Sequence, residues 1–407
     1  MLHQRLTKNP TKSYKIGLPL GLIFWLFVLA LVLRIFLAYI YNTYGPSYVF
    51  FDEQWYRATA DRLWHYWHSA SFAELFDYQK YAFQGFGGRN FGYNIVYALI
   101  SGLFGEFWVR VANSLFVCLA AYFTYLMAIE ISDRKVAILA YCLVLYYPSA
   151  ILYSVTLHKE AFVIFSIALF MLSLTKLFKK FSVKWLVISF FGFLCIFTSR
   201  VYIPILILLA TSLVLIWNSR RNLFPWLVAL ILIVVIFYYL PDIIKEPIHL
   251  SALLSWRSEA VLSVGSRWDT YRRLHLPTSL TALVFYFLQP LPWNFTSIWF
   301  VPVNLGSLVW YMMFPFFLLG LGKSFKTKEI RLIAITILTI AAFYVLIFVT
   351  GTEYRHREQM ISLLAIVSAI GYYRLKSLAF HNKIIFVSIP CALITGLGFY
   401  KLWVLLS

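Results

Sequence analysis

Charged residues are scarce in this chain, and acidic residues are the scarcest of them. Only 13% of the 407 residues are charged and 16 are acidic, whereas a soluble domain averages about 25% charged residues. Hydrophobic residues reach 62%, and apolar runs long enough to cross a bilayer as a helix, about 20 residues, recur along the sequence. The composition excludes a soluble enzyme and a disordered protein, and it predicts an all-α polytopic membrane protein.

Cysteine is rare as well, and its spacing matches no disulfide framework and no metal site. The four cysteines each lie inside an apolar run: Cys118, Cys142, Cys195 and Cys391. The sequence also has no Walker loop and no Gly-x-Gly-x-x-Gly after a strand, so no soluble nucleotide site is expected. We expect no cofactor, and too few carboxylates cluster to favour a divalent metal.

Positive charge exceeds negative charge by 19. Lys and Arg gather in short loops between the apolar runs, where the positive-inside rule places them on the cytoplasmic face, next to anionic lipid headgroups. Membrane topology and lipid headgroups therefore account for the net positive charge, and we do not expect the protein to bind nucleic acid. The N-terminal segment is basic and precedes an apolar run at 16–40, which predicts an uncleaved first span with a cytoplasmic N-terminus.

The apolar runs predict a transmembrane helical bundle of about 11–13 membrane segments. The candidate spans are 16–40, 93–107, 110–130, 136–154, 160–176, 185–200, 202–217, 224–240, 279–291, 305–322, 332–350, 358–373 and 384–404. The early topology stays open: two crossings after the first outer loop would place the basic loop 132–135 outside. Either an early segment is re-entrant, or this loop breaks the charge rule.

Two long polar loops interrupt what we expect to be a single integral membrane domain over 1–407. The first, 41–92, is the first extracytoplasmic loop and holds five of the acidic residues; the second is 241–278. Within the first loop, aromatic and apolar residues between Asp52 and Trp67 recur at roughly helical spacing. This spacing predicts an amphipathic helix that lies in the membrane interface.

The adjacent acids Asp52 and Glu53 follow the first span on its outer side. Two carboxylates beside a membrane are costly unless they are solvated, paired or used. One interpretation makes a carboxylate the general base for an acceptor hydroxyl. The other makes both acids caps of the interfacial helix, because acids are favoured in a first turn.

Cationic side chains recur on the same predicted outer face. They are Lys80, Arg89, His158, Lys159, Arg200, Arg355, His356 and Arg357. Taken singly, each can be an interfacial charge that snorkels to water. Taken together, and beside an acidic pair, they predict a site that binds the phosphate of a lipid substrate, through bidentate Arg and point-charge Lys contacts.

The order of these features resembles the GT-C superfamily of polytopic glycosyltransferases, in particular the bacterial branch similar to protein mannosyltransferases (glycosyltransferase family 39-like). The matching elements are Asp52-Glu53 with Tyr56 and Ala60, Tyr93–Gly105, Arg110 and Asn113, Tyr147-Pro148, His158-Lys159-Glu160, Pro290–Trp293, Trp310-Tyr311 and Tyr354–Arg357. The family's Lys- or His-Pro-Pro element is missing, and Arg89 stands nearest to its place.

The resemblance implies an inverting transferase that moves a hexosyl or pentosyl group from a polyprenyl-phosphate-linked donor to a hydroxyl of a glycan, lipid or protein. It implies action on the extracytoplasmic face of a bacterial inner or plasma membrane, in cell-envelope polysaccharide synthesis. Asp52 corresponds to the catalytic acid, with Glu53 beside it. The loop 41–92 is then the catalytic loop.

Two other functions remain open from the residues. A polymerase or ligase of lipid-linked glycans shares the lipid leaving group, but it would depend on Arg355, His356 and Arg357 more than on the acidic pair. A non-enzymatic lipid or glycan transporter is the third, although transporters tend to carry charges in mid-span and most charges here cluster at span ends.

Overall fold

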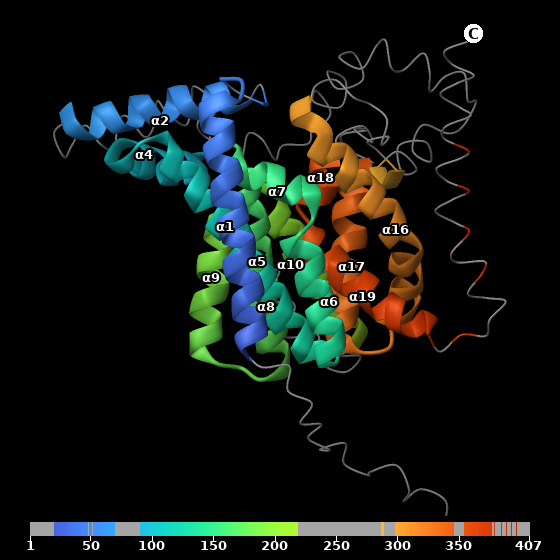
Figure 1. The fold of residues 1–407 in the computed structure, drawn as a ribbon. Coiled ribbons are helices and arrows are strands. Elements are labelled where there is room, and N and C mark those ends of the chain that lie inside the picture. The colour runs from blue at the N-terminus through green and yellow to red at the C-terminus, as the bar shows by residue number, and fades with distance from the viewer. Residues whose placement is uncertain are drawn as a thin grey trace, which may run out of the picture.

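The computed structural model describes residues 20–47, 49–50, 52–69, 90–218, 286–288, 298–345, 354–376 and a few single positions after 376. All regular elements within these ranges are helical, so the all-α prediction is confirmed (Figure 1). The elements are α1 Leu20–Tyr44, α2 Asp52–Ser69, α4 Phe91–Phe104, α5 Glu106–Ile131, α6 Arg134–Leu145, α7 Pro148–Val155, α8 Glu160–Lys179, α9 Val183–Phe197, α10 Tyr202–Asn218, η3 Ile298–Phe300, α16 Val301–Ser324, α17 Lys328–Phe343, α18 Tyr354–Glu358 and α19 Ile361–Leu375.

The helices form a multi-pass membrane bundle. Within the described residues, four helices are long and apolar enough to cross a membrane, or five if the bent pair α6–α7 counts as one span. Four shorter apolar helices, α4, α9, α10 and α19, pack with them. The predicted loop 241–278 and the candidate spans 224–240 and 384–404 fall outside the continuous described ranges, so the count of 11–13 segments stays a prediction.

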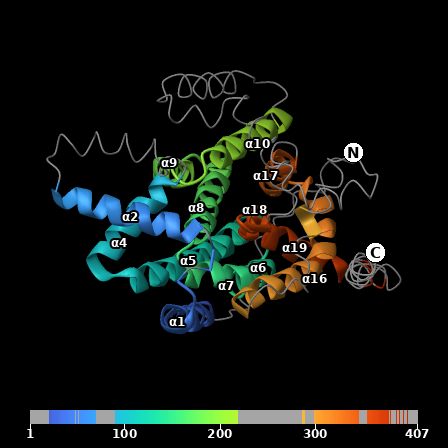
Figure 2. The ribbon, with the colours of Figure 1, turned by 90° about the horizontal axis from the view of Figure 1, so that it is seen from above.

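Helix α2 is the predicted amphipathic helix, and it lies across one end of the bundle, roughly perpendicular to α1 (Figure 1). Its buried face includes Glu53, Tyr56, Ala60 and Leu63, positions three or four apart that share one side of a helix. Trp55 lies off this face and is 40% exposed. The buried face packs against α4, which runs beside α2 when the bundle is seen from above (Figure 2).

Helix α4 resolves the open topology, because both of its ends lie at the α2 end of the bundle. At its start, Gly92 N–H donates to the carbonyl of Thr198. At its far end, Gly105 turns the chain with a φ of 92°, and Glu106 forms an ion pair with Arg57 of α2 at 2.5 Å. Only glycine adopts that φ without strain. The segment is therefore re-entrant and does not cross.

The basic loop 132–135 consequently lies at the opposite end of the bundle, with the other basic loops. Glu130, just before it, forms ion pairs with Lys176 and Lys179. Lys328 donates to the carbonyl of Phe178 across the same end, at 3.1 Å. The loop 132–135 thus agrees with the charge rule, since the basic segments at Lys176–Lys179 and Lys328 lie at the same end.

A proline breaks the next span and brings the following loop to the α2 end. Pro148 opens α7, and Tyr147 before it is extended, with φ −67° and ψ 120°; a residue before proline is pushed out of the helical region. The two helices meet at a bend of 50°. Exposed backbone groups are costly in lipid, and the hydroxyl of Tyr147 donates to the carbonyl of Gly306 at 3.0 Å across this break.

Within the described bundle, a mid-span charge that the sequence pattern did not single out is buried. Arg34 of α1 is fully buried, and it donates to the carbonyls of Ala30 at 3.3 Å and Leu145 at 2.5 Å. Leu145 is the last residue of α6, so its carbonyl lies where the helix is interrupted. The guanidinium therefore satisfies a backbone acceptor that the break leaves without an intrahelical donor.

Helices α16 and α19 pack closely through glycines. A Cβ atom on Gly320 of α16 would lie 1.9 Å from the carbonyl oxygen of Val367 in α19, whereas a Cβ on Gly322 would come no closer than 3.7 Å to Arg374. Small residues let membrane helices approach at backbone distance. This approach fixes α19, and with it the preceding helix α18 that carries Arg355.

We predict that Gly320→Ala destabilises the protein, whereas Gly322→Ala, two residues away on the same helix, does not. Both substitutions gain the same helix propensity, but only the first forces two backbones apart, at a cost of about 1–3 kcal/mol. Thermal unfolding of the purified protein in one detergent measures the difference. Equal midpoints for the two variants would contradict the packing described.

Candidate functional site

The candidate site is built from segment ends that meet below α2. Four segments contribute residues: the first turn of α2, the loop 156–159 between α7 and α8, the corner at Arg200 between α9 and α10, and the short helix α18. These segments are brought together because α4 returns to this end and Pro148 ends α6. The site residues therefore lie where membrane spans are interrupted or end, and not within continuous spans.

Asp52 joins the first loop to the late helix α18. Its Oδ2 atom lies 3.0 Å from Nη1 of Arg355 and 3.7 Å from Nε2 of His158. The side chain is 42% exposed, so the carboxylate stands at the edge between the buried cluster and its surroundings. The neighbouring imidazole of His158, and then the guanidinium of Arg355, lower the pKa of Asp52 to about 2 against the opposing effect of burial.

His158 is fully buried between two carboxylates. Its Nδ1 atom is paired with Oε2 of Glu160, and its Nε2 atom faces Asp52. Burial opposes the charged imidazolium, but the charge of Glu160 and the contacts with Asp52 and Glu160 outweigh it, so the pKa of His158 is raised. The ring also packs 4.6 Å from that of Phe50. His158 is thus fixed on three sides.

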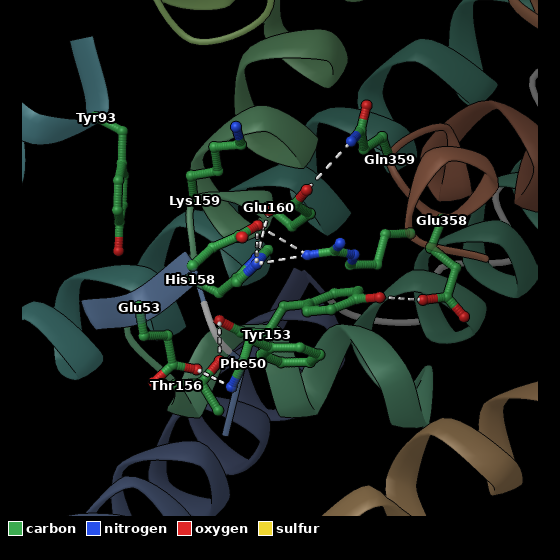
Figure 3. A network of polar contacts seen from close by, with 12 residues as sticks. Phe50, Glu53, Tyr93, Tyr153, Thr156, His158, Lys159, Glu160, Glu358 and Gln359 are labelled. Atoms are coloured by element: carbon green, nitrogen blue, oxygen red, sulfur yellow. Dashed lines mark hydrogen bonds and ion pairs between the residues drawn. The ribbon is translucent and has the colours of Figure 1, made fainter. Parts of the chain in front are cut away.

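Glu160 is one member of a closed ring of hydrogen bonds. Its Oε1 atom accepts from Arg200 at 2.6 Å. The same atom accepts from Gln359 at 3.3 Å (Figure 3). Gln359 accepts from the hydroxyl of Tyr344 at 3.4 Å, which lies 3.1 Å from the hydroxyl of Tyr202. Arg200 closes the ring by donating to Tyr202 at 3.0 Å. The fully buried carboxylate is therefore hydrogen-bonded from several helices, as a buried charge requires.

Lys159 extends away from the Glu160 contacts (Figure 3). Its ammonium donates to the side chain of Asn90 and lies 5.6 Å from the centre of the Tyr56 ring. The side chain is 7% exposed. Burial, and then the charge of Arg200, lower the pKa of Lys159 to about 7. This amine therefore changes charge near neutral pH, unlike an ordinary lysine.

Glu53 has surroundings quite unlike those of Asp52. Its Oε1 atom accepts from the backbone N–H of Phe50 at 3.2 Å, while its own N–H donates to the Phe50 carbonyl at 3.0 Å (Figure 3). Phe50 has no side-chain acceptor, so this reciprocal pair reproduces only the glutamate half of a capping box, at the start of α2. The side chain is buried, and burial raises its pKa. Of the two expected catalytic acids, the geometry favours Asp52 for chemistry and Glu53 for capping.

The two residues after Arg355 face inward. Arg357 is buried, lies 4.9 Å from the centre of the Trp310 ring and donates to the carbonyl of Phe287 at 2.8 Å. His356 stacks on the ring of Tyr344 at 4.1 Å. Both side chains are buried and therefore hold α18 against neighbouring helices.

A third buried carboxylate, Glu358, ends α18. It accepts from the hydroxyl of Tyr153 at 2.6 Å (Figure 3) and lies 3.9 Å from the guanidinium of Arg357. Burial raises the pKa of Glu358 to about 7. This contact ties α18 to α7, the helix that precedes His158.

Comparison with known proteins finds similarity in structure only. No family model matches the chain, and no curated protein matches its sequence. The crystal structure of ArnT from Cupriavidus metallidurans bound to undecaprenyl phosphate matches with a TM-score of 0.52 at 14% identity. The apo structure of the same enzyme matches with a TM-score of 0.51 at 16% identity. ArnT is a GT-C glycosyltransferase.

The chain has the GT-C membrane fold. The match covers 89% of this chain and 61% of the lipid-bound ArnT chain, and 90% and 62% in the apo comparison. The chain thus spans about three fifths of the ArnT chains that it matches. At this identity, the likeness establishes the fold.

On this GT-C fold, five of the expected site residues come together: Asp52, His158, Lys159, Arg200 and Arg355. His356 and Arg357 lie behind them, and Lys80 and Arg89 fall outside the described residues. No group of three or more His, Cys, Asp or Glu side chains among the described residues is placed to hold a metal.

Sequence reasoning did not assign a role to Glu160, Gln359, Tyr202 or Tyr344. Glu160 stood out in the sequence only as part of the His158-Lys159-Glu160 element and as an acid at the first position of an apolar span, which a helix N-terminus also favours. Gln359 and the tyrosines carry no pattern of their own, because their role arises only from the ring that they close in three dimensions.

We predict that Glu53→Ala destabilises the start of α2 by about 0.5–2 kcal/mol, whereas Glu53→Gln has a much smaller effect. The amide oxygen of glutamine can still accept from the Phe50 N–H, and alanine cannot. Hydrogen exchange of the amides in the first turn of α2 measures this, with Gln54→Ala, an exposed neighbour, as the matched control. Equal protection in the alanine and glutamine variants would contradict the capping role.

Proposed function

We propose that this protein is a membrane glycosyltransferase that moves a sugar from a polyprenyl-phosphate-linked donor to an acceptor hydroxyl, with inversion. The observation that carries the proposal is the meeting of Asp52 with Arg355, His158 and Lys159 at one end of the bundle. A carboxylate surrounded by cations beside the membrane suits a reaction that needs both a base and a phosphate-binding group.

The GT-C fold supports the donor class. ArnT, whose fold this chain shares, was crystallised with undecaprenyl phosphate. A donor of this type presents a phosphate at the level of the lipid headgroups, which is where an interfacial helix such as α2 lies. We therefore infer that the lipid phosphate approaches the site beneath or beside α2.

Asp52 is the proposed general base. As the acceptor oxygen attacks the anomeric carbon, its proton passes to the carboxylate of Asp52, and the bond from the anomeric carbon to the phosphate oxygen breaks. The polyprenyl phosphate leaves with that electron pair. A positioned base contributes about 10²–10⁴ to the rate of such a step.

The cations act on the leaving group. Negative charge builds on the departing phosphate, and fixed cations in a partly dry site stabilise it. Arg355, which lies 3.0 Å from Asp52, and Lys159, whose charge acts on Asp52, are the residues proposed for this task. Arg200 is turned toward Glu160, and we assign it to holding His158 in place through that carboxylate.

Several finer expectations belong to the same proposal. They are the family 39-like branch, the extracytoplasmic face, a cytoplasmic N-terminus, a bacterial inner or plasma membrane, and a role in cell-envelope polysaccharide synthesis. The clustering of basic loops at the end opposite the site agrees with the proposed orientation, because such loops face the cytoplasm. The sugar and the acceptor stay undefined.

The alternative functions receive less support from the geometry. A polymerase or ligase was expected to use Arg355, His356 and Arg357, but two of these side chains face the interior of the bundle. A transporter was expected to carry mid-span charges, and the described mid-span Arg34 donates to backbone carbonyls. The printed contacts of His356, Arg357 and Arg34 are structural, so none of them adds support to either alternative.

We predict that Asp52→Asn lowers turnover by about 10²–10⁴-fold, because asparagine cannot accept the proton. The measurement is release of polyprenyl phosphate from a radiolabelled lipid-linked sugar fraction of native membranes, by purified protein. The matched control is Asp61→Asn, which removes the same charge from an exposed position of the same helix. Near-normal turnover by a folded Asp52→Asn variant would rule out Asp52 as the base.

We predict that kcat/KM for the lipid donor falls as pH rises through about 7. The lowered pKa of Lys159 means that its amine is charged below this pH and neutral above it, so phosphate attraction is lost on the alkaline side. The phosphodiester of the donor does not titrate in this range, and kcat/KM reports groups of the free enzyme.

The variant Lys159→Arg tests this assignment. A guanidinium stays charged throughout the range, so the descending limb near pH 7 should disappear even if the maximal rate is lower. Glu358 also titrates near this pH, with a pKa of about 7. A limb that persists in Lys159→Arg would assign the pH dependence to Glu358 or another group.

A further inference from the structure

The ion pair between Asp52 and Arg355 joins the two groups that the reaction must use separately. Arg355 Nη1 lies 3.0 Å from Asp52 Oδ2. In the proposed reaction, Asp52 accepts a proton while Arg355 binds the leaving phosphate. A carboxylate held by a guanidinium is a poorer base, and a guanidinium held by a carboxylate is a weaker phosphate ligand.

The solvent exposure of the Asp52 and Arg355 side chains makes this the ion pair in which a second anion can replace the carboxylate. The side chain of Asp52 is 42% exposed and that of Arg355 is 21% exposed. The ion pair behind it is more enclosed, since Glu160 is fully buried and Arg200 is 14% exposed. Partly exposed ion pairs contribute little to stability, whereas separation of a buried pair is strongly unfavourable. An arriving anion therefore exchanges with Asp52 most easily.

Phosphate is a fitting competitor for Asp52. Both anions offer two oxygens in the geometry that a guanidinium binds by paired hydrogen bonds. Exchange leaves Arg355 paired with one anion throughout. Of its two close partners, Asp52 would then keep only His158, whose Nε2 atom is 3.7 Å away. The carboxylate of Asp52 would therefore regain proton affinity.

We propose that the Asp52–Arg355 ion pair is a latch that the donor opens: the lipid phosphate displaces Asp52 from Arg355, and only then is Asp52 available as the base. This inference rests on the proposed transferase function. It implies an order of events in which the donor engages before the acceptor hydroxyl can be deprotonated. In the unloaded enzyme the base is held inactive by the same residue that later binds the leaving group.

Donor-side affinity tests the latch through a double-mutant cycle. The four proteins are the wild type, Asp52→Asn, Arg355→Gln and the double variant, and the probe is undecaprenyl phosphate in lipid nanodiscs. Removal of the competing carboxylate should tighten binding by about two- to fivefold when Arg355 is present, within the range expected for a partly exposed pair. In the Arg355→Gln background the same substitution should change the dissociation constant by less than about twofold.

The cycle separates competition from simple repulsion between Asp52 and phosphate. Repulsion predicts the same gain from Asp52→Asn in both backgrounds, and that outcome would overturn the latch, as would no gain in either. Asp61→Asn removes a charge from the same helix about 13 Å farther along its axis, and it should leave binding unchanged. Tighter binding by this control would also point to long-range repulsion and overturn the latch.

The proposed function and the latch can fail separately in this experiment. If the wild-type protein does not bind undecaprenyl phosphate, the donor class is wrong and the latch is overturned with it. If the wild type binds and the cycle is additive, the latch alone is overturned and the transferase stands. A gain in affinity from Asp52→Asn that appears only when Arg355 is present supports both the function and the latch.

Discussion

The buried carboxylate of Glu160 is the group on which the arrangement of the site depends. A charge in this position is tolerated only when it is paired and hydrogen-bonded. Arg200, Gln359 and His158 meet that demand from segments that are far apart in the chain. Because His158 is fixed in this way, Asp52 faces an imidazole whose orientation is already set. The chemistry proposed for Asp52 therefore depends on a residue that does not touch the substrate.

The charges of the site form a gradient from enclosed to accessible. The enclosed ion pair between Glu160 and Arg200 has a structural role, whereas the Asp52–Arg355 pair lies at the partly exposed edge of the site. In water the loss of a pair is compensated by hydration, and in the interior it is not. This single difference explains why two ion pairs close to one another can have opposite roles: one holds the site together and one can exchange its partner with a phosphate.

The bundle supplies this site by interrupting its own spans. Backbone groups in lipid must be satisfied within the protein, so each interruption needs a specific partner. Gly105 allows α4 to return, Pro148 ends α6, and Arg34 covers the carbonyl of Leu145 at that break. The interruptions carry polar residues to one end without exposing them to hydrocarbon. The same end holds α2, whose capping by Glu53 places Asp52 at the helix start.

The sequence by itself determined the all-α membrane class, the amphipathic helix after the first span and the acid and cation clusters at span ends, because apolar periodicity and charge position are local properties. It did not determine that α4 returns, that Glu53 caps while Asp52 faces cations, or that Arg357 turns inward. Asp52 and Arg355 are 303 positions apart, and no local pattern links them. Only the tertiary structure decided these contacts, since side-chain direction and burial follow from which helices pack together.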